Sequence, residues 1–319
     1  MAAQGQTLGE LGEFGLVDRL VAGTPVGAGV LLGPGDDAAV VAAPDGRVVA
    51  TTDMLVEGRH FRRDWSDPGE IGRKAAAQNL ADVAAMGARP TALLVSLGAP
   101  PDLPADWALA LADGLRAEAA VVGASLVGGD LVRSDAVVVA VTALGDLEGR
   151  APVTRAGARV GDVVAVAGRL GWAAAGLAVL SRGFRSPRVL VEAHRVPVPP
   201  YAAGPAAALA GATAMIDLSD GLLADAGHLA RASQVAVDVR AGDLVVDDPV
   251  AQAAAAFSAD PLVWVLSGGE DHALLATFPP DAVLPEAFRP VGVVCEGEAG
   301  AVTVDGRAWE GPTGHDHFR

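Results

Sequence analysis

The sequence predicts an α/β (α+β) fold arranged in two domains. Short apolar runs alternate with longer segments of helical spacing, and most of the connections between them are short. A length of 319 residues suits two domains of ordinary size, and 51% of the residues are hydrophobic, which is enough for a core in each. The polar, glycine-containing stretch at 145–150 interrupts the alternation, so we expect domains at 1–150 and 151–319.

The first half of the chain opens with helix signals. Thr7 and Glu10 form the pattern of a capping box, which predicts a helix over 7–22. Asp67-Pro68-Gly69-Glu70 is a second helix start, and Gly87 suits the residue after that helix ends. The remaining predicted elements are a turn over 31–41, strands over 47–53, 93–97 and 137–144, and a helix over 106–122.

The second half repeats the alternation of strands and helices. The stretch 185–200 contains four prolines and is predicted to be irregular. Cys295 is the one cysteine, so it forms no intrachain disulfide, and it follows an apolar run typical of a strand. The other predicted elements are strands over 163–167, 214–217, 235–239 and 273–278, and helices over 172–180, 206–210 and 221–232.

Charge and composition exclude several classes of function. The formal net charge is −16, which makes a nucleic acid an unsuitable partner because its backbone needs a basic surface. We find neither a signal peptide nor a run of about 18 uninterrupted apolar residues, so we expect no membrane span and a cytoplasmic location. Lys74 is the only lysine, and no P-loop or protein-kinase element occurs. A bound phosphate would therefore need arginines, backbone N–H groups and metal ions.

Acidic residues gather in five short clusters beside glycines, hydroxyl residues and apolar runs. Each cluster alone has a structural explanation: a polar turn, a strand end, a solvated helix face, a tight hairpin or a helix cap. Together they suggest carboxylates that converge, repel one another and need Mg²⁺, which is the usual equipment for phosphoryl transfer. The clusters are Gly33–Asp37, Thr51–Asp53, Asn79–Asp82, Gly128–Asp130 and Asp217–Gly221.

These clusters, in this order, resemble the thiamine-monophosphate kinase family. The motif that begins with Thr51-Thr52-Asp53 extends to His60-Phe61. Two further motifs complete the likeness, Ser267-Gly268-Gly269-Glu270-Asp271 and a final Asp316-His317-Phe318. The resemblance implies the two-domain fold of the aminoimidazole ribonucleotide synthetase-like (PurM-like) superfamily. It also implies a homodimer that pairs the N-terminal sheets, with the C-terminal domain completing the active-site cleft. The implied reaction phosphorylates thiamine phosphate to thiamine diphosphate, with ATP as co-substrate and several Mg²⁺ ions.

The resemblance also implies roles for individual residues. The implied Mg²⁺ ligands are Asp37, Thr51, Thr52, Asp53, Asp82, Asp130, Asp217 and Asp220. The implied ATP contacts are Gly129, Asp130, Arg155 and Ser219. The implied thiamine phosphate contacts are His60, Glu270 and His315, where His315 or Trp309 would take the place of the aromatic residue that the family usually has there.

Two alternatives stay open at this point. The first is another ATP-using member of the same superfamily, although a hydrogenase-maturation factor needs a C-terminal cysteine and this chain ends in Arg319. The second is an acidic binding module that holds metal ions without turning over ATP.

Overall fold

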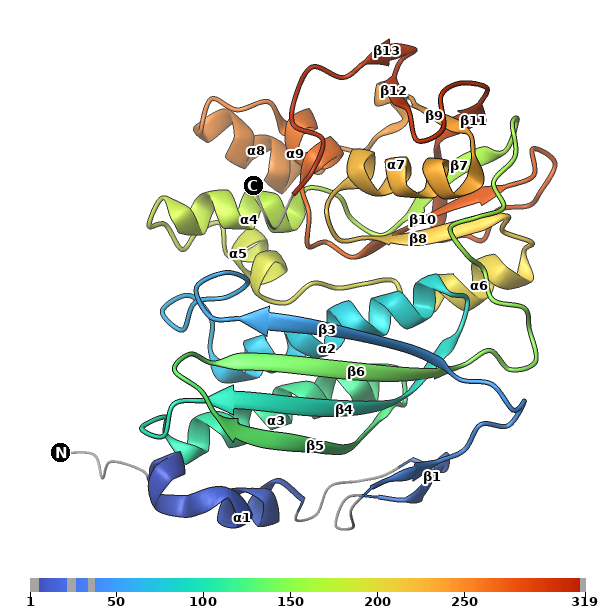
Figure 1. The fold of residues 1–319 in the computed structure, drawn as a ribbon. Coiled ribbons are helices and arrows are strands. Elements are labelled where there is room, and N and C mark those ends of the chain that lie inside the picture. Colours follow the sequence, from blue (N-terminus) through green and yellow to red (C-terminus); the bar gives the residue numbers. More distant parts are fainter. Residues whose placement is uncertain (1–5, 22–26, 34–37, 316–319) are drawn as a thin grey trace. The chain divides into compact units, whose positions relative to one another are not determined.

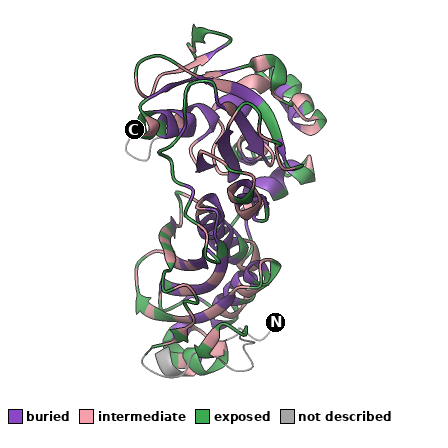
Figure 2. Ribbon diagram, turned by 90° about the vertical axis from the view of Figure 1, so that its right-hand side faces the viewer, coloured by how far each residue is buried: buried purple, intermediate pink, exposed green. Residues whose placement is uncertain are grey.

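The chain forms two compact units. A computed structural model describes residues 6–21, 27–33 and 38–315. The first unit comprises Met1–Val83 with Arg89–Glu148, and the second comprises Ala84–Ala88 with Gly149–Arg319 (Figure 1). Buried residues concentrate on the helices and strands of each unit, and exposed residues concentrate in the loops (Figure 2).

The first unit is built on a four-stranded mixed sheet in the order β3-β6-β4-β5. Strand β4 runs parallel to β5, and the other two pairings are antiparallel. Helices α2 and α3 cover one face of this sheet (Figure 1). The two helices pack closely, since a Cβ on Gly72 would lie 2.1 Å from the backbone O of Leu111. The elements are α1 (Leu8–Val21), β1 (Val30–Leu32), β2 (Val40–Val41), β3 (Val49–Val56), α2 (Pro68–Ala85), β4 (Arg89–Ala99), α3 (Ala105–Val121), β5 (Ser125–Arg133) and β6 (Val138–Asp146).

The two predicted helix starts are confirmed, and both carry a capping box. Thr7 N donates to Glu10 Oε2 at 2.9 Å, and Glu10 N donates to Thr7 Oγ1 at 3.3 Å. The same exchange joins Asp67 and Glu70, at 2.9 and 2.8 Å. These bonds satisfy N–H groups that have no partner within the first turn of a helix, which is why the two helices begin where the sequence predicts.

The other face of the sheet is open within this unit. Side chains alternate between the two faces of a strand, and Thr52, Met54, Ser96, Asp130 and Val132 project from the open face. Met54 and Val132 are each 53% exposed. Exposed apolar side chains on an uncovered sheet face, such as these two, are a feature of association sites.

Two sequence predictions in this unit are wrong. Strand β3 does not end at Asp53 but continues to Val56, so the Thr51–Asp53 cluster lies in mid-strand. Gly128 and Gly129 form neither a turn nor a left-handed backbone, because β5 passes straight through them and pairs with β4. Close approach explains the second glycine, since a Cβ on Gly129 would lie 2.0 Å from the backbone O of Val95.

The second unit contains a seven-stranded sheet in the order β13-β12-β9-β11-β7-β10-β8. Only β12 and β9 run parallel within it. The strands are β7 (Val163–Ala167), β8 (Ala214–Leu218), β9 (Ala236–Val239), β10 (Ala273–Phe278), β11 (Phe288–Cys295), β12 (Val302–Val304) and β13 (Arg307–Ala308). The helices are α4 (Trp172–Ser181), α5 (Arg188–Arg195), α6 (Ala203–Leu209), α7 (Leu222–Ser233), α8 (Asp248–Ala256) and α9 (Pro261–Ser267), with a 3₁₀ turn at Ala241–Asp243.

Alternate residues of β8 enter two different cores. Ile216 and Leu218 pack with Leu222, Ala226 and Leu229 of α7. Met215 faces the opposite way and packs with Leu274, Ala276 and Phe278 of β10 and with residues of α6. Strand β8 is therefore buried along its length and leads directly to the acidic turn before α7.

The predicted irregular stretch 185–200 contains helix α5, so that prediction is wrong. Pro187 precedes the helix, where a missing N–H group costs nothing, and Leu190, Val191 and His194 are buried. Cys295 ends β11 half-buried, which confirms the predicted strand residue, and burial raises the pKa of its thiol. Among the described residues, none of the helices is long and apolar enough to cross a membrane.

Candidate active site

Strand β3 and helix α2 bring three of the predicted ligands together in the first unit. Thr51 Oγ1 donates to Asp82 Oδ2 at 2.8 Å, and the backbone N of Asp53 donates to Asn79 Oδ1 at 2.9 Å. Asn79 is fully buried and its side-chain amide also donates to Ala75 O at 2.9 Å, which fixes its orientation. Asp82 is therefore part of a polar cluster facing β3 and does not lie on a solvated helix face.

Thr52 and Asp130 lie elsewhere on the same sheet. Thr52 projects from the open face, where Thr142 Oγ1 donates to its hydroxyl at 3.2 Å. Asp130 also lies on the open face, on β5, together with Gly129. Strands β3 and β5 are the two edges of the sheet, so about 14 Å separates them across three strand spacings. One chain therefore does not bring Asp130 to the same cation as Asp53.

His60 lies just after β3 and is held from two sides. Its Nδ1 accepts a hydrogen bond from Val56 N at 3.0 Å, so the proton of the neutral ring lies on Nε2. Lys74, which is only 2% exposed, donates to the backbone O of His60 at 3.1 Å. The one lysine of the chain thus supports the His60 loop from α2.

In the second unit, Asp217 lies near the end of β8, and the turn between β8 and α7 holds Ser219 and Asp220. Helix α7 begins at Leu222, and its N-cap is Gly221, with φ 125° and no side-chain cap. The structural explanation of this cluster as a helix cap therefore does not apply to Ser219 or Asp220. Asp225 Oδ2 instead accepts from Asp220 N at 3.0 Å and from Gly221 N at 3.1 Å.

Negative charge is concentrated around this turn. Burial raises the pKa of the Asp225 carboxyl to about 7, and the charges of Asp217 and Asp220 add to the increase. Oxygen and nitrogen atoms of Asp220, Asp225 and His228 all lie within 4.8 Å of one another. Asp225 was not among the predicted site residues, although its position in the first turn of α7 was a signal for contact with the acidic turn.

The Glu270 segment lies against the same turn. Glu270 N donates to Ser219 O at 2.8 Å, and the Glu270 carboxylate is 3.4 Å from Nδ1 of the buried His194 on α5. Glu270 has a left-handed backbone with φ 67°, which is uncommon for a residue other than glycine. Because α5 was not predicted, the role of His194 was not visible in the sequence.

His315 and Trp309, the two candidates for the aromatic position, lie in different surroundings. His315 N donates to Asp220 O at 3.0 Å, which places His315 at the acidic turn. Trp309 packs partly against the core around α7, and its indole N–H donates to Pro312 O at 3.0 Å. Of the two candidates for the aromatic position, His315 is the one beside Asp220.

Arg155 lies apart from these groups. It is exposed, and its backbone O accepts from Ser233 Oγ at 2.8 Å, at the C-terminal end of α7. A helix of 12 residues spans about 18 Å, and Asp220 precedes the other end of it. Asp36, Asp37, Asp316 and His317 lie outside the described residues.

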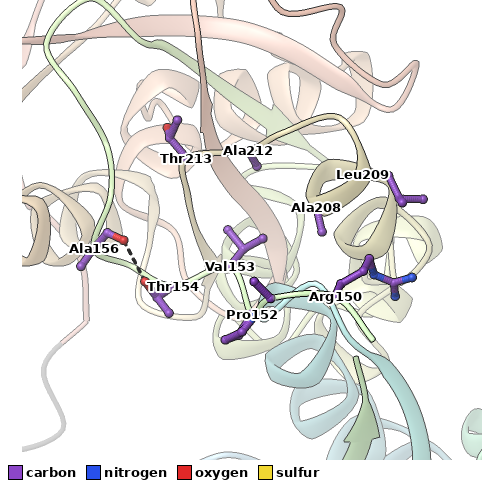
Figure 3. Close-up of a pocket in the computed structure, with 10 residues that line it drawn as sticks. Arg150, Pro152, Val153, Thr154, Ala156, Ala208, Leu209, Ala212 and Thr213 are labelled. Carbon is purple, nitrogen blue, oxygen red and sulfur yellow. Dashed lines mark hydrogen bonds between the residues drawn. The ribbon is translucent and has the colours of Figure 1, made fainter. Parts of the chain in front are cut away.

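A groove of about 430 Å³ in the second unit is a separate feature (Figure 3). Both of its threonine hydroxyls are already engaged: Thr154 Oγ1 donates to Ala156 O at 2.8 Å, and Thr213 Oγ1 is 2.6 Å from Asp162 Oδ2. Arg150 donates to Gly87 O at 3.3 Å. None of the predicted site residues lines this groove, so the acidic clusters remain the candidate site.

The donor atoms of both acidic clusters fit Mg²⁺. They are carboxylate and hydroxyl oxygens, which hard cations prefer, and the sulfur and imidazole ligands typical of zinc or copper sites are few.

Comparison with known proteins agrees with this combination of fold and acidic clusters. The family model "AIR synthase related protein, N-terminal domain" matches residues 35–147, so the first unit belongs to that class. Thiamine-monophosphate kinase of Mycobacterium tuberculosis is 54% identical over 319 residues, covering 100% of this chain and 95% of the relative.

Two solved structures are also similar over nearly the whole chain. The crystal structure of thiamine monophosphate kinase from Aquifex aeolicus has a TM-score of 0.78 and 32% identity, and covers 96% of this chain and 100% of its own. A second structure, AaThiL complexed with AMPPCP and TMP, has a TM-score of 0.81 and 34% identity, and covers 98% of this chain and 99% of its own. The chain belongs to the thiamine-monophosphate kinase family, and its fold is the two-domain α/β fold of that family.

Proposed function

We propose that this chain transfers the terminal phosphoryl group of ATP to thiamine phosphate, forming thiamine diphosphate and ADP. Relatives that match the full chain at 54% identity are thiamine-monophosphate kinases, and a similar solved structure holds AMPPCP and TMP. The observation that carries the proposal is the meeting of Thr51, Asp53 and Asp82 from a strand and a helix. An acidic binding module without turnover gives no reason for the full-length match to kinases.

The acidic residues of both units serve this reaction as Mg²⁺ ligands. Bound Mg²⁺ would neutralise phosphate charge, including the charge that develops on the transferring group. The Thr51 hydroxyl holds the carboxylate of Asp82, and the Asn79 side chain holds the backbone of Asp53 through its N–H group. The proposed ligands are Asp37, Thr51, Thr52, Asp53, Asp82, Asp130, Asp217 and Asp220.

Other residues bind and orient the two substrates. His60 presents Nε2–H as a donor because its Nδ1 already accepts from Val56 N, and this donor suits a phosphate oxygen of thiamine phosphate. Glu270 and His315 contact the same substrate. Gly129, Asp130, Arg155 and Ser219 contact ATP, where the planar guanidinium of Arg155 suits two-point binding of phosphate.

The reaction needs no protein base. The attacking group is a phosphate oxygen of thiamine phosphate, which is already ionised near neutral pH. The barrier comes from bringing two polyanions together, so positioning and charge stabilisation are the contributions asked of the protein.

We further propose that the chain acts as a homodimer whose four-stranded sheets pair through their open faces. Met54 and Val132 are exposed on that face, and burying them favours association. Thr52 and Asp130 both project from the open face but lie on its opposite edge strands, so a second copy can supply the Asp130 that one chain keeps distant from Thr52. Action in the cytoplasm stays a prediction of the sequence.

A product assay tests the proposed reaction. The purified chain is incubated with ATP, Mg²⁺ and thiamine phosphate, and the products are separated by chromatography. We expect thiamine diphosphate and ADP in equal amounts, and no product when EDTA removes the metal. If correctly folded protein forms no diphosphate, the proposed function is wrong.

A further inference from the structure

Asp217 is a buried carboxylate one residue before the end of strand β8, and a histidine lies beside it. Its Oδ2 lies 3.2 Å from Nδ1 of His272, and each of the two side chains is 7% exposed. Within the described part of the chain, His272 is the side chain that forms an ion pair or hydrogen bond with Asp217. A buried carboxylate without such a donor would carry a large desolvation cost.

The backbone fixes the imidazole of His272 in this position. His272 has a left-handed backbone with φ 50°, and its N–H donates to Leu218 O at 3.1 Å. Strand β10 begins at the next residue and pairs with β8, with Ala273 opposite Leu218 and Leu274 opposite Asp217. Asp217 and His272 are thus held by the same pair of strands.

The preceding residue anchors the segment on its other side. Asp271 accepts hydrogen bonds from Trp172 N at 3.1 Å and from Ala173 N at 2.8 Å, at the start of α4. The backbone of His272 therefore cannot move away from Asp217 without breaking contacts to both β8 and α4.

The contact orients the carboxylate of Asp217. Nδ1 donates when it carries a proton, and the bond to Oδ2 sets the plane of the carboxylate while Oδ1 stays outside this contact. Donors that hold a metal-binding carboxylate in place commonly change metal affinity by about 10- to 100-fold when they are removed.

We propose that His272 is a positioning residue, which holds Asp217 in the orientation that binds a divalent cation. The proposal rests on the proposed function, in which Asp217 is a Mg²⁺ ligand. His272 itself contacts neither substrate and acts through Asp217.

The test measures Mn²⁺ binding to the full chain without substrates, by electron paramagnetic resonance of the free ion. The Asp217→Asn variant defines the part of the binding that depends on Asp217. We expect His272→Leu to weaken that part by about tenfold or more, since leucine has no donor. We expect His272→Asn to recover most of the affinity, because its side-chain amide places a donor near the position of Nδ1.

A destabilising variant elsewhere in β10 shows whether a general loss of stability in this strand is enough to weaken Mn²⁺ binding. Thr277 is fully buried, and its hydroxyl lies 2.6 Å from that of Thr213. Thr277→Val should lower the melting temperature without changing Mn²⁺ binding. Melting curves without metal confirm that each variant is folded.

The outcomes separate the two proposals. If His272→Leu binds Mn²⁺ as the wild type does while Asp217→Asn binds it weakly, the role of His272 is wrong and that of Asp217 stands. Equal weakening by leucine and asparagine overturns positioning through a hydrogen bond. If Asp217→Asn binds Mn²⁺ like the wild type, the metal role of Asp217 and the role of His272 are both wrong. In that case the product assay still reports on the kinase activity itself.

Discussion

Asp271 is a buried carboxylic acid at the start of α4, and its environment opposes ionisation. Burial raises the pKa of the Asp271 carboxyl to about 7, although hydrogen bonds from the backbone of Ala173 and Gly171 act to lower it. The folded chain therefore keeps a proton on Asp271 at pH values where the unfolded chain has already lost it. Stability gained in this way is present below about pH 4 and is lost as the pH rises to about 7.

We expect Asp271→Asn to remove this pH dependence, because an amide stays neutral. The free energy of unfolding of the wild type minus that of the variant should fall between pH 5 and 7, by at most about 1.4 kcal/mol per pH unit, and then level off. Denaturation with urea at several pH values measures this difference. A difference that does not change with pH would show that Asp271 is ionised in the folded chain throughout this range.

Some residues of the candidate site could be predicted from the sequence, and others could not. Thr51, Asp53 and Asp82 were predicted as one site from their types and flanking residues, and the structure brings them together. His272 and Asp225 were not predicted, although both contact predicted residues. Their positions depend on how β10 and α7 pack against β8, and such contacts between distant segments leave no local pattern in the sequence.

Elements were predictable where their ends carry a chemical signal. The capping boxes of α1 and α2 located both helix starts, whereas proline-rich residues concealed α5. Helix α9 is a short apolar segment, and the spacing of hydrophobic residues does not distinguish a short buried helix from a strand, so this helix was not predicted. The two glycines of β5 suggested a turn because glycine favours turns, but here the second one allows two strands to approach.

Strand β5 offers a direct test of that explanation. A Cβ on Gly129 would lie 2.0 Å from Val95 O in the backbone of β4, whereas a Cβ on Gly128 would meet only the side-chain end of Leu94 at 3.1 Å. We expect Gly129→Ala to lower the free energy of unfolding by about 1–3 kcal/mol, because the strands must separate. Gly128→Ala is the matched control and should stay within about 1 kcal/mol of the wild type. Urea denaturation of both variants makes the comparison, and equal stabilities would contradict the close approach.

At the scale of the whole molecule, the first unit of one chain does not bring all of its proposed Mg²⁺ ligands together. The cluster on β3 and α2 lies at one edge, and Asp130 lies at the other edge on the open face. The sequence predicted that these acids would converge, but it could not show that three strand spacings separate them within one chain. Which strands form the edges depends on the pairing order, and neighbouring positions in the sequence do not determine that order.

A mixing experiment decides whether a second copy supplies Asp130. We expect Asp53→Asn and Asp130→Asn each to be inactive alone, because each removes one carboxylate from every site. In a dimer that contains one chain of each kind, one site carries both changes and the other carries neither. Random mixing makes about half of the dimers of this kind, so the mixture should regain about a quarter of wild-type activity.

The control for this experiment pairs two changes within one cluster. Asp53→Asn mixed with Asp82→Asn leaves one defect in every site, since both residues come from the same chain, so that mixture should stay inactive. Refolding the variants together with two different affinity tags isolates the mixed dimers, and the product assay measures their turnover. If isolated mixed dimers of Asp53→Asn and Asp130→Asn are as inactive as the control, Asp130 serves the site of its own chain or none. That result would overturn the proposal that the two chains of a dimer share each active site.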